Sequence, residues 1–394
     1  MGYGIWQGRS ALPSSIFYLL SSLRMSSVFV CGSGAVSPAG WGVASLRQAL
    51  TRGEPIPTRE LARPGWNDSL RVRAVPAPSP RPSFLTHARL RRASPIAHHA
   101  VAVALEALAQ GGAGGWRREG AAPANSQPAS SLQPAGRLGI VLCVMSGCVN
   151  YSRRFYDEAL TDPATASPLV FPETVFNAPA SHLAAVLGTT AINYTLVGDP
   201  GTYLQGLALG ADWLLSGRVD GCLVIGAEEM DWLTTDAFRL FDTKVIVSDG
   251  AGALYLKREP LPLAPSPSHG EGERGRGVQL RAVTQPRVFS KTQTRAQAAQ
   301  LTRADLAATG PNQLLCDGLQ GAPLTDSAEL AAWRDWTGPR LSPKVILGEG
   351  LMAAAAWQCV AAIDALQQCR YSAANVSVVG CNQQAIAAQF GPEE

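Results

Sequence analysis

Short apolar runs and longer helical patterns alternate along most of the chain. Runs such as LGIVLCVM at 138–145 and AINYTLV at 191–197 have the length and composition of buried strands. Between such runs lie stretches of ten or more residues with apolar positions at helical spacing, for example VAVALEALAQ at 101–110. Strands that alternate with helices of this length favour a fold built of α/β layers.

Residues 191–229 contain the most informative strand, turn and helix. AINYTLV predicts a strand buried on both faces, GDPG predicts a turn, and an interior helix begins at Thr202 and stops at Gly217. Such a helix directs four unpaired N–H groups and a partial positive charge at the preceding turn, where they would lower a cysteine's pKa or bind an oxyanion. The turn instead carries Asp199, which suits the N-cap, and Pro200, which suits the first helical position.

Residues 171–229 resemble the core of β-ketoacyl synthases, the condensing enzymes of fatty-acid and polyketide assembly. Other segments resemble further parts of these enzymes in the same order and spacing: 28–56, 138–147, 249–259, 315–333, 342–366 and 376–390. The resemblance covers most of 26–258 and 278–394. It implies the thiolase-like fold, a duplicated five-layer αβαβα arrangement usually found as a dimer.

The sequence departs from this family at the positions where catalysis would occur. The position of the family's cysteine nucleophile falls on Pro200. The first catalytic histidine falls on Gly318 or Asp317, depending on where one extra residue is placed, and the second falls on Glu349. The lysine of the second motif is kept as Lys344. All three core catalytic residues of the family are therefore absent.

The histidine content agrees with this conclusion. The chain has 5 histidines, and only His269 lies beyond residue 182. His269 belongs to a low-complexity stretch that is poorly suited to holding a catalytic imidazole. Decarboxylative condensation needs a thiol to carry the acyl group and polar donors to hold the enolate oxygen. The sequence offers no evident place for either group.

We therefore interpret the chain as a β-ketoacyl synthase-like protein of fatty-acid or polyketide biosynthesis that does not itself condense. Within the family it resembles the chain-length factors, which pair with an active ketosynthase, although those partners more often carry glutamine where this chain has Pro200. The resemblance implies an active ketosynthase subunit (heterodimer) or a second copy (homodimer) as partner, an acyl carrier protein as a further partner, and no cofactor.

Other functions stay open at this point. One is an acyltransferase or condensing enzyme with a site rebuilt from Lys344, Glu349, Cys381 or Thr202. Another is an acyl-binding scaffold that works without a ketosynthase, and a degenerating gene is a third interpretation.

Composition and charge narrow the class of protein. The 394 residues are 46% apolar and 16% charged, which is enough to bury a large core. A net charge of +3 is too small to indicate nucleic-acid binding. The cysteines show no C-x-x-C pairing, so we expect buried, reduced thiols in a cytoplasmic protein without disulfides or a zinc site. They are Cys31, Cys143, Cys148, Cys222, Cys316, Cys359, Cys369 and Cys381.

Weaker motifs have structural interpretations. Gly32 and Gly34 follow an apolar run as in a dinucleotide loop, but Ser37 stands where a third glycine belongs, so we expect no nucleotide cofactor. Ser146 lacks the preceding glycine of a hydrolase elbow. His182 is expected to pack or to hydrogen-bond at a helix start. The acidic residues at strand ends and turns form no convincing metal-ligand set: Glu228, Glu229, Asp242 and Asp249.

Segment composition predicts the chain's organisation. Residues 1–25 are expected to be disordered or untranslated, with translation starting at Met25, and their apolar stretch is too short for a membrane span. Residues 26–258 and 278–394 form the two ketosynthase-like halves. Residues 111–136 are a surface-loop insert, and 259–277 a low-complexity linker.

A basic run on a predicted helix at 88–108 offers one candidate docking surface. Arg89, Arg91 and Arg92 lie at its beginning, ahead of the apolar part. They form either a solvated helix face or a docking patch for an acidic carrier protein, which the family resemblance implies.

Overall fold

The computed structural model describes residues 27–112, 136–240, 242–259, 277–306, 308 and 310–393. Two groups of strands have the same spatial order. The first runs β6 (Ile192–Val197), β5 (Leu138–Val144), β7 (Gly221–Glu228), β9 (Gly250–Lys257), β1 (Phe29–Ser37). The second runs β13 (Arg340–Leu341), β12 (Gln313–Cys316), β14 (Ala373–Val379), β15 (Gln384–Pro392), β10 (Val278–Val283). Antiparallel pairing of β1 with β10 joins them into one sheet path.

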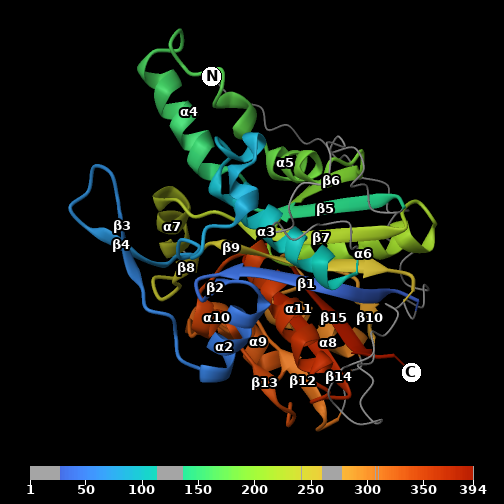
Figure 1. Cartoon of the computed structure of the whole chain (residues 1–394). Coiled ribbons are helices and arrows are strands. Elements are labelled where there is room, and N and C mark those ends of the chain that lie inside the picture. Colours follow the sequence, from blue (N-terminus) through green and yellow to red (C-terminus); the bar gives the residue numbers. More distant parts are fainter. Residues whose placement is uncertain are drawn as a thin grey trace, which may run out of the picture.

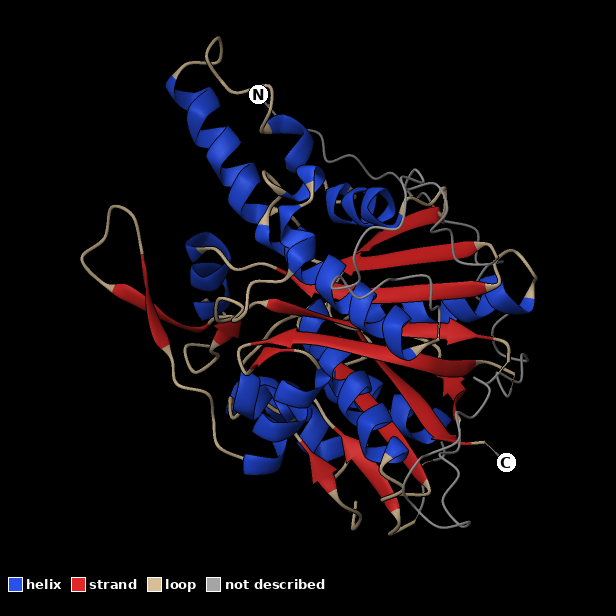
Figure 2. Ribbon diagram, viewed as in Figure 1, coloured by secondary structure: helices blue, strands red, loops and turns tan. Residues whose placement is uncertain are grey.

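Helices separate and cover these two groups of strands (Figures 1 and 2). α3 (Pro95–Gln110) and α5 (Ala178–Leu187) cover the outer face of the first group. α6 (Thr202–Leu215) and α11 (Met352–Gln367) lie between the two groups, and α8 (Arg295–Leu306) and α9 (Pro323–Ala332) cover the outer face of the second. The predicted duplicated five-layer αβαβα arrangement is confirmed.

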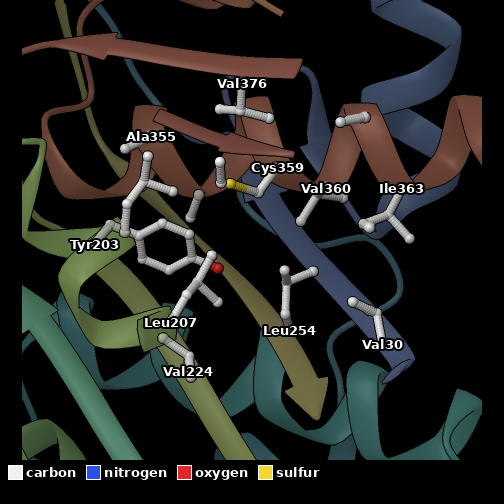
Figure 3. Packing of buried hydrophobic residues seen from close by; sticks show 14 of the residues in the cluster. Val30, Tyr203, Leu207, Val224, Leu254, Ala355, Cys359, Val360, Ile363 and Val376 are labelled. Carbon is white, nitrogen blue, oxygen red and sulfur yellow. The ribbon is translucent and has the colours of Figure 1, made fainter. Parts of the chain in front are cut away.

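Alternation along the strands explains why both faces are covered. In β7, Cys222 and Val224 pack into the central core with α6 and α11, whereas Leu223 and Ile225 pack on the outer side with α3. Successive side chains of a strand point to opposite faces, so a run that is apolar at every position needs helices on both sides. Figure 3 shows the central contact, in which Tyr203 of α6 lies near α11.

The remaining elements surround these layers. They are β2 (Gly40–Trp41), α2 (Val43–Arg52), β3 (Arg59–Ala62), β4 (Ser69–Arg73), 3₁₀ turns at Ser83–Thr86, Ala88–Leu90 and Phe171–Glu173, α4 (Val149–Thr161), α7 (Trp232–Arg239), β8 (Val247–Ser248), β11 (Arg287–Val288) and α10 (Pro343–Leu347). β3, β4 and β8 form a separate small sheet. α4 has no buried residue and projects from the body of the molecule (Figure 1).

The paired glycines of β1 allow close packing against a helix. A Cβ atom on Gly32 would lie 2.0 Å from the carbonyl oxygen of Ala107, and one on Gly34 would lie 2.1 Å from that of Val103. Both carbonyls belong to α3, which therefore crosses β1 at backbone contact. The spacing of these two glycines follows from the close approach of a helix to a strand.

Three sequence predictions about local structure are wrong. The run 191–197 is the edge strand β6, and several of its side chains are exposed, because α5 and α6 cover the faces of this last strand only in part. The helix predicted over 88–108 begins only at Pro95, after a 3₁₀ turn, since proline is favoured in the first turn of a helix. Cys369 is exposed and Cys381 partly so, while the other cysteines are buried.

Several segment predictions fall outside the described residues. They include the fate of residues 1–25 and most of the loop insert at 111–136 and of the linker at 259–277. The division into halves at that linker stays a prediction. No helix in the described part of the chain is long and apolar enough to cross a bilayer.

Candidate functional site

The turn before α6 has its N–H groups already occupied. Thr202 N donates to Asp199 O at 2.8 Å, Tyr203 N to Pro200 O at 3.2 Å and Leu204 N to Gly201 O at 3.1 Å. Pro200 has no N–H to offer. The sequence predicted four open N–H groups at this helix end, and that prediction is wrong because the entering chain closes tight turns on them. No oxyanion-binding set of donors is left here.

Asp199 is buried and connects this turn to the loop between β14 and β15. Its Oδ1 accepts from Gly201 N at 3.2 Å, and its Oδ2 accepts from Gln383 N at 3.0 Å and Gln384 N at 3.4 Å. Burial raises the pKa of Asp199, although these N–H groups oppose the rise. The residue at the N-cap is Gly201, not Asp199 as predicted.

The predicted catalytic positions come together around one cavity of about 140 Å³. Pro200 contributes from the α6 turn, Gly318 from the segment after β12, and Lys344 and Glu349 from α10 and the residues after it. Cys381 contributes from the β14–β15 loop. The cavity therefore lies between segments of the two groups of strands, and its described lining carries neither the cysteine nor the histidines of the family motifs.

A buried ion pair fills the position of the second family histidine. Lys344 Nζ donates to Glu349 Oε2 at 2.8 Å, and Glu349 Oε1 accepts from Leu351 N at 2.8 Å. Burial lowers the pKa of Lys344, but the adjacent Glu349 carboxylate outweighs burial and raises it above the usual range. Gly348, with a φ of 93°, ends α10 and allows Glu349 to turn back toward Lys344.

Glu329 is a residue of this cavity that the sequence analysis did not identify. It lies in α9, is buried, and accepts from Gly318 N at 3.0 Å through Oε2. Burial raises its pKa to about 8, and the nearby Asp317 carboxylate adds to the rise. Asp326, one helical turn earlier, also lines the cavity. Acidic residues at i and i+3 directly after the Gly318 segment are the signal that could have identified this face.

Gly318 leaves no space for the first family histidine without a shift of Glu329. A Cβ atom on Gly318 would lie 3.0 Å from Glu329 Oε2 and 3.7 Å from Lys344 Nζ. Asp317, the other position considered, is buried and turned away from the cavity lining toward Ser342 Oγ, from which it accepts at 2.6 Å. Acidic and cationic groups occupy the region where an imidazole would stand.

The remaining nucleophile candidates are poorly activated. Burial raises the pKa of Cys381 to about 12, and the carboxylates of Glu349 and Asp199 contribute further. A thiol with that pKa is almost entirely protonated at neutral pH. Thr202 is buried in the first turn of α6 and does not line the cavity. The cavity can hold a polar ligand through its charged groups, but it presents no ready acyl carrier.

The other predicted residues lie away from this cavity. Arg89 belongs to a 3₁₀ turn, while Arg91 and Arg92 follow it before α3, and all three are exposed. The prediction that these arginines lie on a helix face is therefore wrong. His182 is buried in α5 and its Nε2 lies 2.7 Å from Glu173 Oε2, which confirms its structural role.

Glu228 and Glu229 receive hydrogen bonds from protein groups. Glu228 Oε2 accepts from Ser146 N at 3.0 Å, and Glu229 accepts from Ser94 Oγ at 2.5 Å and Asn150 N at 2.8 Å. Within the described residues no group of three or more acidic, histidine or cysteine side chains is arranged to hold a metal.

Comparison with solved structures identifies the fold. No protein-family profile and no curated protein matches the sequence. "The ishigamide ketosynthase/chain length factor" is similar with a TM-score of 0.69 and 18% identity, over 93% of this chain and 99% of that chain. A β-ketoacyl synthase from Burkholderia phymatum STM815 gives a TM-score of 0.69 and 17% identity over the same shares.

A third similar structure is a ketosynthase, ApeO, in complex with its chain length factor, ApeC, from Xenorhabdus doucetiae. It gives a TM-score of 0.67 and 15% identity, over 93% of this chain and 98% of that chain. The predicted resemblance to ketosynthases and chain-length factors is confirmed at the level of the fold.

Proposed function

We propose that this protein is a non-condensing, ketosynthase-like subunit that pairs with an active ketosynthase in the manner of a chain-length factor. The proposal rests on the turn at the N-terminus of α6, where Pro200 stands in place of a nucleophile and the first backbone N–H groups are occupied. Condensation needs a thioester and a stabilised oxyanion. A subunit with this fold and this turn is suited to forming an interface rather than to chemistry.

The structural neighbours support a paired role. They include ketosynthase and chain-length-factor complexes and a complex with an acyl-carrier protein. These partners are those of the neighbouring structures. For this chain an active ketosynthase as partner and an acyl carrier protein as ligand are part of the proposal.

An exposed apolar edge is available for such a partner. β6 is the last strand of its sheet path, and Ile192, Tyr194 and Val197 are 46%, 53% and 53% exposed. An uncovered strand edge with apolar side chains is prone to pair with another chain. The projecting α4 adds Tyr156 and Leu160, which are 63% and 68% exposed. We propose that a partner subunit covers β6 and α4.

Co-expression with an active ketosynthase tests the pairing. We expect a stable heterodimer by size and mass, and a product length that differs from that of the ketosynthase without this subunit. A monomer or strict homodimer that leaves the product unchanged would remove the proposal. Acyl chains retained by the isolated protein would instead favour the scaffold interpretation.

A rebuilt acyl-transfer site is the second candidate, because the cavity collects Lys344, Glu349 and the thiol of Cys381. Its test is covalent loading by acyl and malonyl carrier proteins, followed by mass spectrometry of wild type and Cys381→Ser. An adduct that is lost in Cys381→Ser would establish this function. We expect no adduct in either protein, because the pKa of Cys381 is raised to about 12.

The exposed arginines Arg89, Arg91 and Arg92 are proposed as a docking patch for the acidic carrier protein. Opposite charges steer association, and the effect weakens with salt. The double variant Arg91→Glu/Arg92→Glu should weaken carrier binding severalfold at low salt. The double variant Lys291→Glu/Arg334→Glu, at two exposed residues just before α8 and just after α9, serves as a charge-matched control away from this patch. Equal binding by the two double variants at low salt would dismiss the patch.

A further inference from the structure

A second, larger cavity has a lining that shares no residue with the candidate site. It has a volume of about 280 Å³ and is formed by α2, β13, the end of α11 and the residues that follow α11. Three arginines line it: Arg47, Arg340 and Arg370. Asp364 is the one acidic residue in the lining. The cavity therefore carries an excess of positive charge, which favours an anionic ligand.

The arginines leave donors available for that ligand. Arg47 donates from Nε and Nη2 to Asp364, at 2.5 to 2.9 Å, and this bidentate pair fixes its guanidinium at the cavity wall. Arg370 is exposed, and among the described residues it has no carboxylate partner; its guanidinium lies 5.8 Å from the centre of the Tyr371 ring. A free guanidinium beside a fixed one is suited to binding a carboxylate or phosphate oxygen pair.

Arg340 connects this cavity to the candidate site. Its Nη1 donates to Asp317 Oδ2 at 3.4 Å, a long contact, and its Nη2 donates to the carbonyl of Trp333. Asp317 directly precedes Gly318, which lines the other cavity. An anion that attracts Arg340 competes with Asp317 for the same guanidinium.

Apolar residues make up most of the remaining lining. Val43, Leu46 and Leu50 of α2 line the cavity together with Leu341 and Ala361. Leu50 and Leu341 are only partly buried in the described structure, so apolar surface is left for a ligand to cover. A purely inorganic ion would leave this surface uncovered, whereas a ligand with a short apolar body would remove it from water.

We propose that this cavity binds a small amphiphilic carboxylate, with its head group on Arg370 and Arg340 and its apolar body against Leu50 and Leu341. The site is separate from the proposed subunit function and does not depend on it. Loss of pairing with a ketosynthase would leave this inference intact, and loss of carboxylate binding would leave the pairing intact.

Calorimetric titration of the full chain with octanoate tests the site, with octanol and acetate as probes that each lack one half of the ligand. We expect octanoate to bind at least about tenfold more tightly than either. Arg370→Gln should weaken octanoate binding about tenfold, in the range of one lost hydrogen bond to a charged group. Arg370→Lys should retain part of the affinity because it keeps the charge.

The matched control is Arg154→Gln, an exposed arginine on α4 outside this cavity, which should bind octanoate as the wild type does. Leu50→Asp, which places a negative charge in the apolar wall, should abolish binding, with folding checked by circular dichroism. The proposal is overturned if octanoate does not bind, if octanol or acetate binds equally well, or if Arg370→Gln matches the wild type. Octyl phosphate distinguishes the anion source: tighter binding than octanoate would overturn the assignment to a carboxylate.

Discussion

At the scale of single residues, the candidate site contains a buried ion pair, and no histidine lines its cavity in the described residues. Lys344 and Glu349 are both nearly inaccessible, and their contact of 2.8 Å compensates the cost of burying two charges. Such a pair favours a fixed arrangement of the cavity wall over proton transfer. Each charge is stabilised by the other. Removing one should therefore lower the free energy of unfolding, because its partner stays buried without an opposite charge.

Glu349→Gln should lower the free energy of unfolding by about 3 kcal/mol, because Lys344 would keep its charge in a buried place without its carboxylate. Urea unfolding at neutral pH measures this difference. The control is Glu158→Gln, which breaks a solvent-exposed pair with Arg154 and should cost less than about 1 kcal/mol. Equal effects of the two substitutions would contradict the role assigned to the buried pair.

Glu329 should make stability depend on pH. Burial raises its pKa in the folded protein to about 8, above its value in the unfolded chain. The folded state therefore holds the proton more tightly, so this contribution is fully present below the unfolded pKa and is lost as pH rises through about 8. Glu329→Gln imitates the protonated form and should flatten the decline in unfolding free energy between pH 5 and 8.5 (about the two pKa values). An unchanged pH profile would mean that Glu329 does not titrate in this range.

At the scale of elements, the sequence predicted α6 well and its environment poorly. The apolar residues from Thr202 onward and the stop near Gly217 predict the helix that the structure contains. The hydrogen bonds of Asp199 to Gln383 and Gln384 could not be predicted, because these residues are far away in sequence and no local pattern relates them. The same limit applies to Glu329, whose contact with Gly318 depends on how α9 packs.

Asp199→Ala should lower the free energy of unfolding by about 3 kcal/mol, since it leaves buried N–H groups of Gly201 and Gln383 without an acceptor. Asp199→Asn retains one acceptor oxygen and should have a smaller effect. Thermal and urea unfolding of both variants gives the comparison. If both variants had the same free energy of unfolding, the hydrogen bonds between Asp199 and the β14–β15 loop would not contribute measurably to stability.

Strand β6 shows why an apolar run does not determine burial. Its apolar residues Ile192, Leu196 and Val197 suggested a buried strand, yet only β5 pairs with it within the described chain, and several of its side chains are exposed. An apolar run indicates that the side chains of a strand are buried. It does not indicate whether the residues that bury them belong to the same chain or to a partner. The prediction of burial on both faces fails for the isolated chain and is consistent with a proposed partner.

At the scale of the whole molecule, the duplicated arrangement of strands and helices does not depend on catalytic groups at the candidate site. Both halves have the same strand order, and α6 and α11 pack against each other in the centre, so the fold is complete without any catalytic group. Within the described residues, no strand pairs with the outer edge of β6. The proposed function at this scale is association with a partner subunit that covers this edge.

Ile192→Lys should weaken association with the ketosynthase partner, because it places a charge on the exposed side chain of the edge strand without removing a buried contact. We expect at least about a tenfold rise in the dissociation constant, measured by sedimentation with the co-expressed partner, while the unfolding free energy of the isolated chain changes by less than about 0.5 kcal/mol, as for other surface substitutions. The control is Leu301→Lys on α8, a similarly exposed apolar residue away from β6. If both variants assemble like the wild type, the partner does not use this edge, and the apolar character of β6 would need a different explanation.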